Sequence, residues 1–457
     1  MDDGMEVLAK IPNPNAGPRF LTTASEVATR HFRLTGMIQL CEILDLQIPR
    51  IYASSSDSSN AVGAEYIIEE KASGKPLGSV WYQWSRDSQL DMIAKIVDLE
   101  RKLASISFPR HGCIYYTADL EVHGVASESL MPLLDHPILQ KFTLGPLTEA
   151  RHWDGARSKM SLDRGPWNNT LEYFNALGTN EINWVESYAK PRMNYRRSTE
   201  RPESPDDFLS LLTRYMQLAP YLAPPTSRST NVRTLSHPDL HLDNIFVNPT
   251  TKEITHIIDW QSASVSEIFL QRGVPPLIPR SANDGSDEAM EGGLKCDGAN
   301  NRDLRPGLMR HYERLTRTSN PRRWEALKDD RISALTKPAS LICGAWDRAD
   351  VFSFRHALIN IVARWETLFP ENRPCPVHFT DSELELHGEE MELLEGLGTI
   401  MRELEAANMI PLGGMVRPEN YEHAQYVNNF FKEEFISLAD NEHQKALHSK
   451  VWPYQDV

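Results

Sequence analysis

Apolar residues recur along this chain at the three-to-four spacing that is typical of amphipathic helices. The stretches with this spacing are residues 22–44, 87–107, 168–190, 205–222, 323–336, 349–368 and 381–407. Short apolar runs bounded by turn residues predict strands at residues 64–69 and 245–247. The pattern therefore predicts a mixed α/β chain in which short strands interrupt a largely helical fold.

Two polar stretches are expected at the surface of this fold. Residues 279–306 are rich in Asn, Asp, Gly and Ser, which predicts a long mobile loop. The helix expected at 381–407 is strongly acidic, and its acidic side chains are interpreted as a solvated face. They are Glu383, Glu385, Glu389, Glu390, Glu392 and Glu395.

The composition is that of an ordinary globular protein, with 40% hydrophobic and 24% charged residues. Its 457 residues indicate two lobes or domains. The net charge of −15 argues against a nucleic-acid-binding protein, which would present a basic surface. Five widely spaced cysteines without a C-x-x-C pair favour a reducing compartment. The sequence contains no run of 18 apolar residues, so no membrane span is expected. The acidic N-terminus resembles neither a signal peptide nor a transit peptide.

The segment HPDLHLDN, residues 237–244, carries the clearest chemical signal in the sequence. Four residues separate Asp239 from Asn244, and His237 stands two positions before Asp239. This H-x-D-x-x-x-x-N spacing is that of the catalytic loop of protein kinases. In that loop the aspartate accepts the proton of the substrate hydroxyl, and the asparagine binds magnesium. The segment therefore predicts Asp239 as a catalytic base and Asn244 as a metal ligand.

A second acid follows at the distance that such a site requires. Asp259 lies within the segment 255–260, an apolar strand candidate that comes after a short polar turn. In kinases a second metal ligand follows the catalytic loop on a nearby strand. Carboxylate and amide oxygens suit Mg²⁺, which takes few protein ligands besides the nucleotide phosphates. Asp259 is therefore the predicted partner of Asn244 in binding magnesium.

Two other interpretations of the segment remain open on the residues alone. On a strand, its alternating histidines and aspartates would share one face and could bind zinc or iron as in a metal hydrolase. These residues are His237, Asp239, His241 and Asp243. Pro238 argues against a regular strand, and such a site would give Asn244 no role. The second alternative is a polar surface loop beside a hairpin.

The stretches SHPDLHLDNIFVN and HIIDWQSA resemble the aminoglycoside-phosphotransferase and choline-kinase superfamily. Within it, the chain is similar to a fungal group named for altered inheritance of mitochondria (protein 9). The narrower resemblance is carried by AKIP, NAGP, TTASEVAT, VGAEYII and DRGPW. The superfamily implies a protein kinase-like α/β fold of two lobes. Residues 1–75 would form an incomplete N-terminal β lobe, and residues 76–457 a large helical C-terminal lobe that contains the catalytic loop.

The resemblance also implies a nucleotide site. Lys10, on a strand that follows a turn, would bind the phosphates, and Glu26 in the first turn of the next helix would pair with it. Without the resemblance, Lys10 would be a surface charge and Glu26 a favourable residue at the helix dipole. Backbone groups of Glu70 and Ala72, at the hinge between the lobes, would hydrogen-bond adenine.

Two features favour weak nucleotide binding. Glu69 stands at the position that faces the adenine pocket, where relatives usually carry an apolar residue, and a charge buried there is costly without a partner. The two strands and the phosphate-covering loop expected before the Lys10 strand are missing, which indicates a truncated sequence or a degenerate kinase. The strand near residues 5–11 should then lie at a sheet edge, where unpaired backbone groups invite association.

The expected function is transfer of the ATP γ-phosphate, with Mg²⁺, to a hydroxyl of a small molecule. Asp239 would act as the base while His237 orients the loop. The alternative is a catalytically impaired kinase-like binding or scaffold protein linked to mitochondria. The resemblance implies a mitochondrial location, with the cytoplasm as the alternative, and neither nucleic acid nor an integral membrane segment is expected. The acceptor stays open, since fold does not determine substrate.

Overall fold

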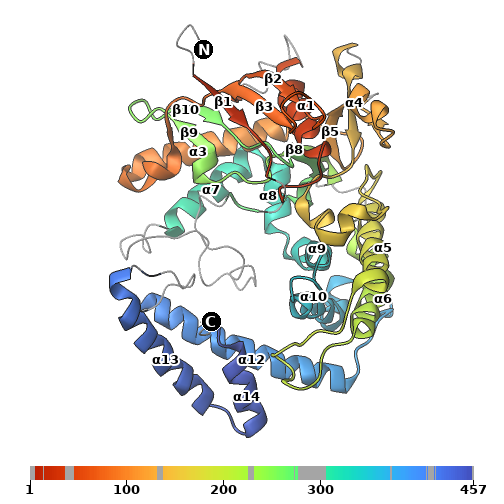
Figure 1. Ribbon diagram of the computed structural model, residues 1–457, viewed down its shortest axis with the longest axis vertical. Coiled ribbons are helices and arrows are strands. Elements are labelled where there is room, and N and C mark those ends of the chain that lie inside the picture. The colour runs from red at the N-terminus through yellow and green to blue at the C-terminus, as the bar shows by residue number, and fades with distance from the viewer. Residues whose placement is uncertain are drawn as a thin grey trace. The chain divides into compact units, whose positions relative to one another are not determined.

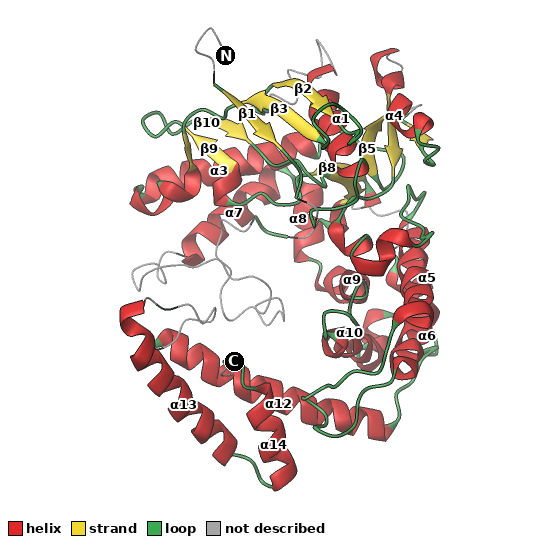
Figure 2. Cartoon of the chain, in the orientation of Figure 1, coloured by secondary structure: helices red, strands yellow, loops and turns green. Residues whose placement is uncertain are grey.

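A computed structural model describes most of the chain. The described residues are 6–13, 15–35, 46–130, 137–224, 231–271, 273–275, 305–370, 373–407, 409, 416 and 418–454. The chain forms two compact units. The first unit comprises Met1–Trp184, Ala219–Asp284 and Gly298–Gly344, and the second comprises Val185–Leu218, Gly285–Asp297 and Ala345–Val457. Figure 2 shows strands in the first unit only, while the second unit is helical.

A small antiparallel sheet near the N-terminus forms the first part of the first unit (Figure 1). Its strands are β1 (Val7–Lys10), β2 (Ile51–Ser55) and β3 (Tyr66–Glu70), in the order β1-β3-β2. The β-branched and aromatic residues of β3 favour a central strand. The expectation that the first strand lies at a sheet edge is confirmed, because among the described residues β1 pairs with β3 alone.

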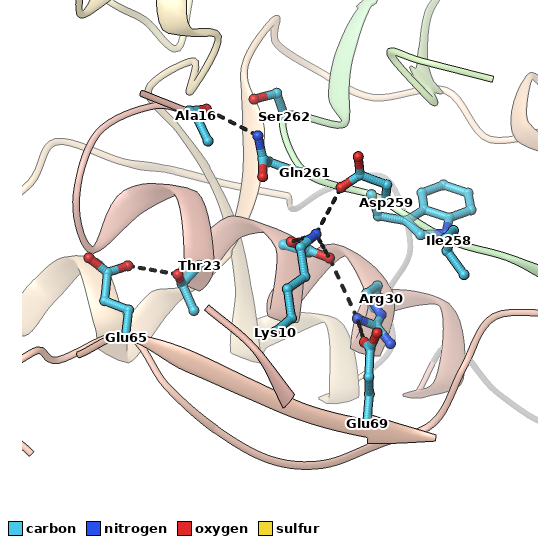
Figure 3. Close-up of polar contacts among 12 residues, drawn as sticks. Lys10, Ala16, Thr23, Arg30, Glu65, Glu69, Ile258, Asp259, Gln261 and Ser262 are labelled. Atoms are coloured by element: carbon cyan, nitrogen blue, oxygen red, sulfur yellow. Dashed lines mark hydrogen bonds and ion pairs between the residues drawn. The ribbon is translucent and has the colours of Figure 1, made fainter. Parts of the chain in front are cut away.

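Helix α1 (Leu21–Thr35) follows β1 and contacts β2, β3 and β5. Glu65, just before β3, accepts hydrogen bonds from the Phe20 amide at 2.8 Å and the Thr23 hydroxyl at 2.7 Å (Figure 3). This carboxylate supplies hydrogen-bond acceptors at the N-terminus of α1, and its negative charge interacts favourably with the helix dipole. The prediction that the helix begins at residue 22 is therefore correct to within one residue. Its predicted extension to residue 44 falls on 36–45, outside the described residues.

The catalytic-loop segment is flanked by two short strand pairs. Strand β8 (Arg233–Ser236) pairs with β11 (Ser264–Glu267), and β9 (Ile245–Val247) pairs with β10 (Ile254–Ile257). The turn between β9 and β10 closes as predicted, because the Asn248 side chain accepts hydrogen bonds from the Thr250 and Thr251 amides. The loop therefore projects from a double hairpin that fixes both of its ends.

Residues 74–76 do more than end a strand, which is all that their sequence predicts. Lys75 and Pro76 form β4, which pairs with β9 at Val247 and Phe246. Gly74 takes φ +93°, a conformation that L side chains rarely adopt. Its backbone approaches the carbonyl oxygen of Val247 so closely that a Cβ at this position would collide with it. The segment that leaves β3 is therefore docked onto the β9–β10 hairpin.

The remaining elements of the first unit surround one large apolar core. The strands are β5 (Cys113–Tyr116), β6 (Glu128–Ser129) and β7 (Phe142–Gly145), and the helices are α3 (Arg86–Leu103), α4 (Thr117–Val122), α7 (Arg305–Ser319), α8 (Pro321–Lys328) and α9 (Asp330–Leu341). Core residues come from α1, α3, β7, the β9–β10 hairpin and the chain on either side of that hairpin, among them Phe32, Ile93, Ile96, Phe142, Leu240, Ile245, Val247, Ile257 and Trp260. The backbone of the predicted site is thus anchored in the core.

The second unit is helical. It contains α10 (Val351–Ala363), α11 (Trp365–Leu368), α12 (Asp381–Ala406), α13 (Tyr421–Ser437) and α14 (Glu442–Val451), with parts of α5 (Thr170–Tyr188) and α6 (Pro205–Leu222). A capping box between Thr380 and Glu383 starts α12. A core cluster of α12, α13 and the chain after α14 includes Leu397, Leu404, Phe435 and Trp452.

One glutamate of α12 contradicts the interpretation of this helix as having a solvated acidic face. Glu390 is completely buried and forms an ion pair with Arg197, whose Nε lies 2.7 Å from Oε1. It also pairs with Arg355 and accepts a bond from Asn194 Nδ2 at 3.0 Å. Two arginines compensate its charge, which sequence position along a single helix does not reveal.

The mixed α/β fold predicted from the sequence is confirmed: a small N-terminal sheet with its helix precedes a helix-rich chain that carries the loop. Two predicted helices are each divided, at Asp329 and at Arg364. The predicted mobile loop falls mostly outside the described residues, and its last two residues, Arg305 and Pro306, belong to α7. Within the described residues no helix is both long and apolar enough to cross a membrane.

We expect the Gly74→Ala variant to lose more stability than Gly63→Ala, its matched control. Both glycines have positive φ, but a Cβ at Gly63 meets no atom within 4 Å. Conformational strain alone should lower the free energy of unfolding of Gly63→Ala by about 1–2 kcal/mol. The collision with Val247 should add at least about 1 kcal/mol for Gly74→Ala. Urea unfolding of the two variants measures the difference, and equal losses would contradict the docking of this segment.

Candidate active site

Lys10, Glu26 and Asp259 meet in one cluster although they come from three separate parts of the chain. Figure 3 shows the Lys10 amine pointing toward Asp259. The Lys10 Nζ donates to both carboxylate oxygens of Glu26, at 3.0 and 2.9 Å. The same Nζ donates to Asp259 Oδ1 at 2.8 Å. The predicted ion pair of Lys10 and Glu26 is therefore present in the structure, and the predicted metal ligand Asp259 joins it.

The cluster keeps Lys10 charged. Burial alone would lower the pKa of Lys10, but the nearby charges of Glu26 and Asp259 outweigh it and raise this pKa above its ordinary value. Glu26 is only 3% exposed. It lies in the second turn of α1, since the helix begins at Leu21, so its expected place in the first turn is wrong. The helix dipole acts mainly within the first turn, and the ion pair therefore accounts for Glu26 better.

A second buried ion pair adjoins this cluster. Arg30, one helical turn after Glu26, pairs with Glu69 on β3, and both side chains are almost fully buried. Arg30 Nη2 also donates to the carbonyl of Pro49 at 2.7 Å. Glu69 was expected to be costly because it lacked an evident partner. The structure supplies that partner, so the carboxylate is compensated within the fold.

His237 orients the loop through its backbone contacts. Its Nδ1 accepts a hydrogen bond from the Asp239 amide at 3.2 Å, and its Nε2 donates to the carbonyl of Ile258 at 2.9 Å. These contacts require the neutral ring with its proton on Nε2. Burial lowers the pKa of His237 below its ordinary value, in agreement with that state. His237 thereby ties Asp239 to the residue before Asp259.

The two loop residues with predicted chemical roles differ in exposure. Asn244 is 7% exposed, and its Nδ2 donates to the carbonyl of Asp239 at 2.9 Å, which fixes the amide. The Asp239 side chain is 56% exposed, with Oδ2 at 3.4 Å from His241 Nε2. The carbonyl of Asn244 accepts the Ile258 amide at 3.0 Å. The base candidate is thus open to solvent, while its neighbours are held by the backbone of the loop.

Asp259 occupies an unusual backbone conformation, with φ +62°. Asp and Asn tolerate this left-handed region better than other non-glycine residues. Its side chain is 42% exposed although one oxygen is bonded to Lys10. The second oxygen and Asn244 Oδ1 are hard oxygen donors of the kind that Mg²⁺ prefers. The residues present therefore fit a magnesium ion held by few protein ligands.

The interpretation of the loop as a zinc or iron site does not fit this geometry. Both ring nitrogens of His237 are engaged by backbone groups, and His241 Nδ1 accepts the Asp243 amide at 3.1 Å. Within the described residues, no group of three or more His, Cys, Asp or Glu side chains is arranged to hold a metal. The hydrogen bonds of His237 and Asn244 give the loop a defined conformation beside the β9–β10 hairpin.

The predicted hinge residues lie at the end of β3 and just beyond it. The Glu70 amide donates to the carbonyl of Arg50 at 2.8 Å, so only the Glu70 carbonyl would be suited to a nucleotide base. Ala72 follows the strand and is partly buried. Next to it, the Ser73 amide donates to His256 Nδ1 at 3.2 Å. This contact fixes the segment after β3 to β10.

Sequence reasoning missed two residues of this region, Arg30 and His256. Arg30 follows Glu26 by four positions, a spacing at which side chains of opposite charge meet on a helix, so a signal was present. His256 gave no comparable signal, since its contact with Ser73 joins segments 183 residues apart. Tertiary contacts of that kind become visible only in the folded chain.

The chain is similar to several fungal proteins. The subtelomeric hrmA-associated cluster protein of Aspergillus fumigatus is 31% identical over 507 residues, which cover 99% of this chain and 93% of that protein. The mitochondrial altered inheritance of mitochondria protein 9 of Zygosaccharomyces rouxii is 26% identical, with 80% of this chain and 63% of that protein covered. The protein of the same name from Saccharomyces cerevisiae is 23% identical, with 85% and 66% covered. No family model matches the chain.

Similar solved structures include aminoglycoside phosphotransferases. One is a putative enzyme from Ralstonia eutropha, 14% identical with a TM-score of 0.37, covering 80% of this chain and 86% of that chain. Another is a phosphotransferase in a ternary complex with streptomycin and ATP, 13% identical with a TM-score of 0.37, covering 78% and 86%.

The lowered pKa of His237 predicts how stability depends on pH. Above the unfolded-state pKa of about 6.5, the His237 ring is neutral in both the folded and the unfolded state. The contacts of the neutral ring then contribute fully to the free energy of unfolding. As the pH falls below that value, the unfolded chain binds a proton that the folded chain rejects, so stability decreases. His237→Phe, which retains a ring against Trp260, should weaken this decrease. Urea unfolding of both proteins between about pH 7 and pH 5 tests it, and parallel pH dependences would contradict it.

Proposed function

The chain belongs to the family of the subtelomeric hrmA-associated cluster protein of Aspergillus fumigatus, and we propose that it is an ATP-dependent phosphotransferase. It would transfer the γ-phosphate of ATP to a hydroxyl group of a small molecule. The observation that carries the proposal is the meeting of Lys10 with Glu26 and Asp259 beside the organised loop 237–244. A charged lysine held between two carboxylates, next to an exposed aspartate, suits phosphate binding and proton acceptance.

Each residue of the site would have a distinct role. Lys10, whose pKa is raised, stays protonated and binds phosphate oxygens. Glu26 holds the amine in place, and Asn244 with Asp259 would hold Mg²⁺, which neutralises phosphate charge when bound. The Glu70 carbonyl and the Ala72 amide would bind adenine at the hinge.

Asp239 is the proposed base. Its exposed carboxylate accepts the proton of the acceptor hydroxyl as that oxygen forms a bond to the γ-phosphorus. The bond from the γ-phosphorus to the bridging oxygen breaks, and ADP leaves. His237 contributes orientation alone, because both ring nitrogens are occupied by backbone contacts. Chemistry of this kind depends on positioning and charge more than on covalent participation.

Two further proposals concern organisation and location. Residues 1–75 would act as the N-terminal lobe that carries Lys10 and Glu26, and residues 76–457 as the C-terminal lobe that carries the loop. A mitochondrial location is proposed from the names of the altered inheritance of mitochondria protein 9 relatives. The chain spans about two thirds of the length of those relatives, and their names do not specify an acceptor.

We expect Asp259→Asn to lower the rate of magnesium-ATP hydrolysis by roughly 10²-fold or more, since one charge-stabilising group is lost. The fold should survive, because Asn also tolerates the positive φ of this position. Asp98→Asn is a matched control: Asp98 is 46% exposed and also pairs with basic side chains. Phosphate release with purified protein measures the rates, and circular dichroism checks folding.

A second variant separates binding from chemistry. Asp239→Asn should retain magnesium-ATP binding in calorimetry and lose hydrolysis, because the base does not contact the nucleotide in the proposed mechanism. An unchanged hydrolysis rate in Asp259→Asn would refute the assignment of the site.

Tight magnesium-ATP binding without any hydrolysis by the unmodified chain would favour a non-catalytic binding protein.

A further inference from the structure

Five charged side chains of alternating sign form a continuous row through the N-terminal sheet and α1. From Asp259 the row runs through Lys10, Glu26 and Arg30 to Glu69. Figure 3 labels Asp259, Lys10, Arg30 and Glu69 along this row. The three middle members come from β1 and α1, and Glu69 comes from β3. Asp259, Lys10 and Glu26 belong to the nucleotide site proposed above. The pair of Arg30 and Glu69 does not, so it requires its own explanation.

Stability alone does not account for that pair. Arg30 and Glu69 are 3% and 5% exposed, and removing two charges from water costs as much as their attraction returns. Two apolar side chains of similar volume would often stabilise such a site equally well or better. The pair therefore points to a task that apolar side chains would not perform.

The distances around Glu26 indicate what that task is. Glu26 Oε1 accepts from Lys10 Nζ at 3.0 Å, whereas Arg30 Nη1 lies 3.5 Å from the same oxygen. Arg30 instead makes its close contact with Glu69 and a hydrogen bond with the Pro49 carbonyl. Two cations thus compete for one carboxylate, and Glu69 draws one of them away.

Arg30 has the means to turn toward Glu26. It follows Glu26 by one helical turn on the same face of α1, where opposite charges readily pair. Its Nε is buried and has no hydrogen-bond partner among the described residues. A guanidinium planar fork binds carboxylates more strongly than an ammonium does, because it can donate two parallel hydrogen bonds. Without Glu69, Arg30 would be the stronger competitor for Glu26.

We propose that Glu69 is a positioning residue that holds Arg30 away from Glu26 and so reserves the Glu26 carboxylate for Lys10. The proposal rests on the proposed function insofar as Lys10 binds nucleotide phosphates. It gives a role to an acidic residue at a position where an apolar one was expected. It also means that the two members of one ion pair have opposite effects on the nucleotide site.

The test is a set of three variants with magnesium-ATP affinity measured by calorimetry. Glu69→Gln should weaken binding by about tenfold to a hundredfold, because Arg30 takes Glu26 and Lys10 loses its support. Arg30→Met should retain the affinity within about threefold, since no competing cation is left. The double variant Arg30→Met with Glu69→Gln should restore the affinity lost in Glu69→Gln.

This restoration distinguishes the proposal from a merely structural role. If the pair only clamps α1 onto β3, the double variant should bind as weakly as Glu69→Gln. If Glu69 contacts the nucleotide itself, restoration should fail as well. Should Glu69→Gln not fold, Arg30→Met and the double variant still decide the matter, because weak binding by both would overturn the proposal. Thermal unfolding of every variant reports the effect on stability separately.

A second readout needs no nucleotide. The rate at which an amine-specific reagent modifies Lys10, located by peptide mass mapping, follows how often the amine leaves its carboxylate partners. Glu26 holds this amine with two hydrogen bonds, so Glu69→Gln should speed the modification and the double variant should return it to the original rate. Equal rates in all variants would refute the competition between Arg30 and Lys10.

One further control separates the two proposals. Lys10→Met in the otherwise unmodified chain should weaken magnesium-ATP binding. If it does not, the proposed function fails, while the Lys10 modification rates still test the role of Glu69. If Lys10→Met weakens binding and Glu69→Gln does not, the proposed function stands and the role of Glu69 is refuted.

Discussion

The amine of Lys10 is the point on which the arrangement of the site depends. A partly buried ammonium is stable only beside compensating charge, and here Glu26 on α1 and Asp259, just after β10, supply it. Because the two acids lie more than 200 residues apart in the chain, satisfying this single charge brings distant segments together. The N-terminal sheet, its helix and the catalytic loop thus share one electrostatic requirement.

The loop 237–244 has a defined conformation for a different reason. Its backbone groups lie against an apolar core and need hydrogen-bond partners. Leu240, Ile245 and Ile257 are buried, while His237 and Asn244 use their side chains to satisfy backbone groups next to them. Buried backbone groups must find partners, so these two polar residues hold the loop in one conformation. The exposed carboxylate of Asp239 is therefore presented from a rigid base.

The sequence was sufficient to predict features that depend on local spacing. Most helices follow from the periodicity of apolar residues, and the family resemblance implied the pairing of Lys10 with Glu26 that the structure contains. The sequence was insufficient where a segment far away in the chain determines the start of a helix or the partner of a charged side chain. The turn of α1 that holds Glu26 depends on a start that Glu65 caps, and the charge of Glu69 is compensated only because α1 places Arg30 against β3. Glu390 shows the same limit, since its two arginines come from other segments of the chain.

The edge position of β1 has a consequence for dynamics. Lys10 ends a strand that pairs with a single neighbour, so the backbone that carries it is secured by one ladder and by the ion pairs of its own side chain. Strands of this kind open locally at a lower free energy than the strands of a buried core. Anything that binds Lys10 would therefore slow hydrogen exchange of the β1 amides, and anything that releases its carboxylates would hasten it. The time that the Lys10 amine stays bonded to its carboxylates is thus linked to local opening of β1.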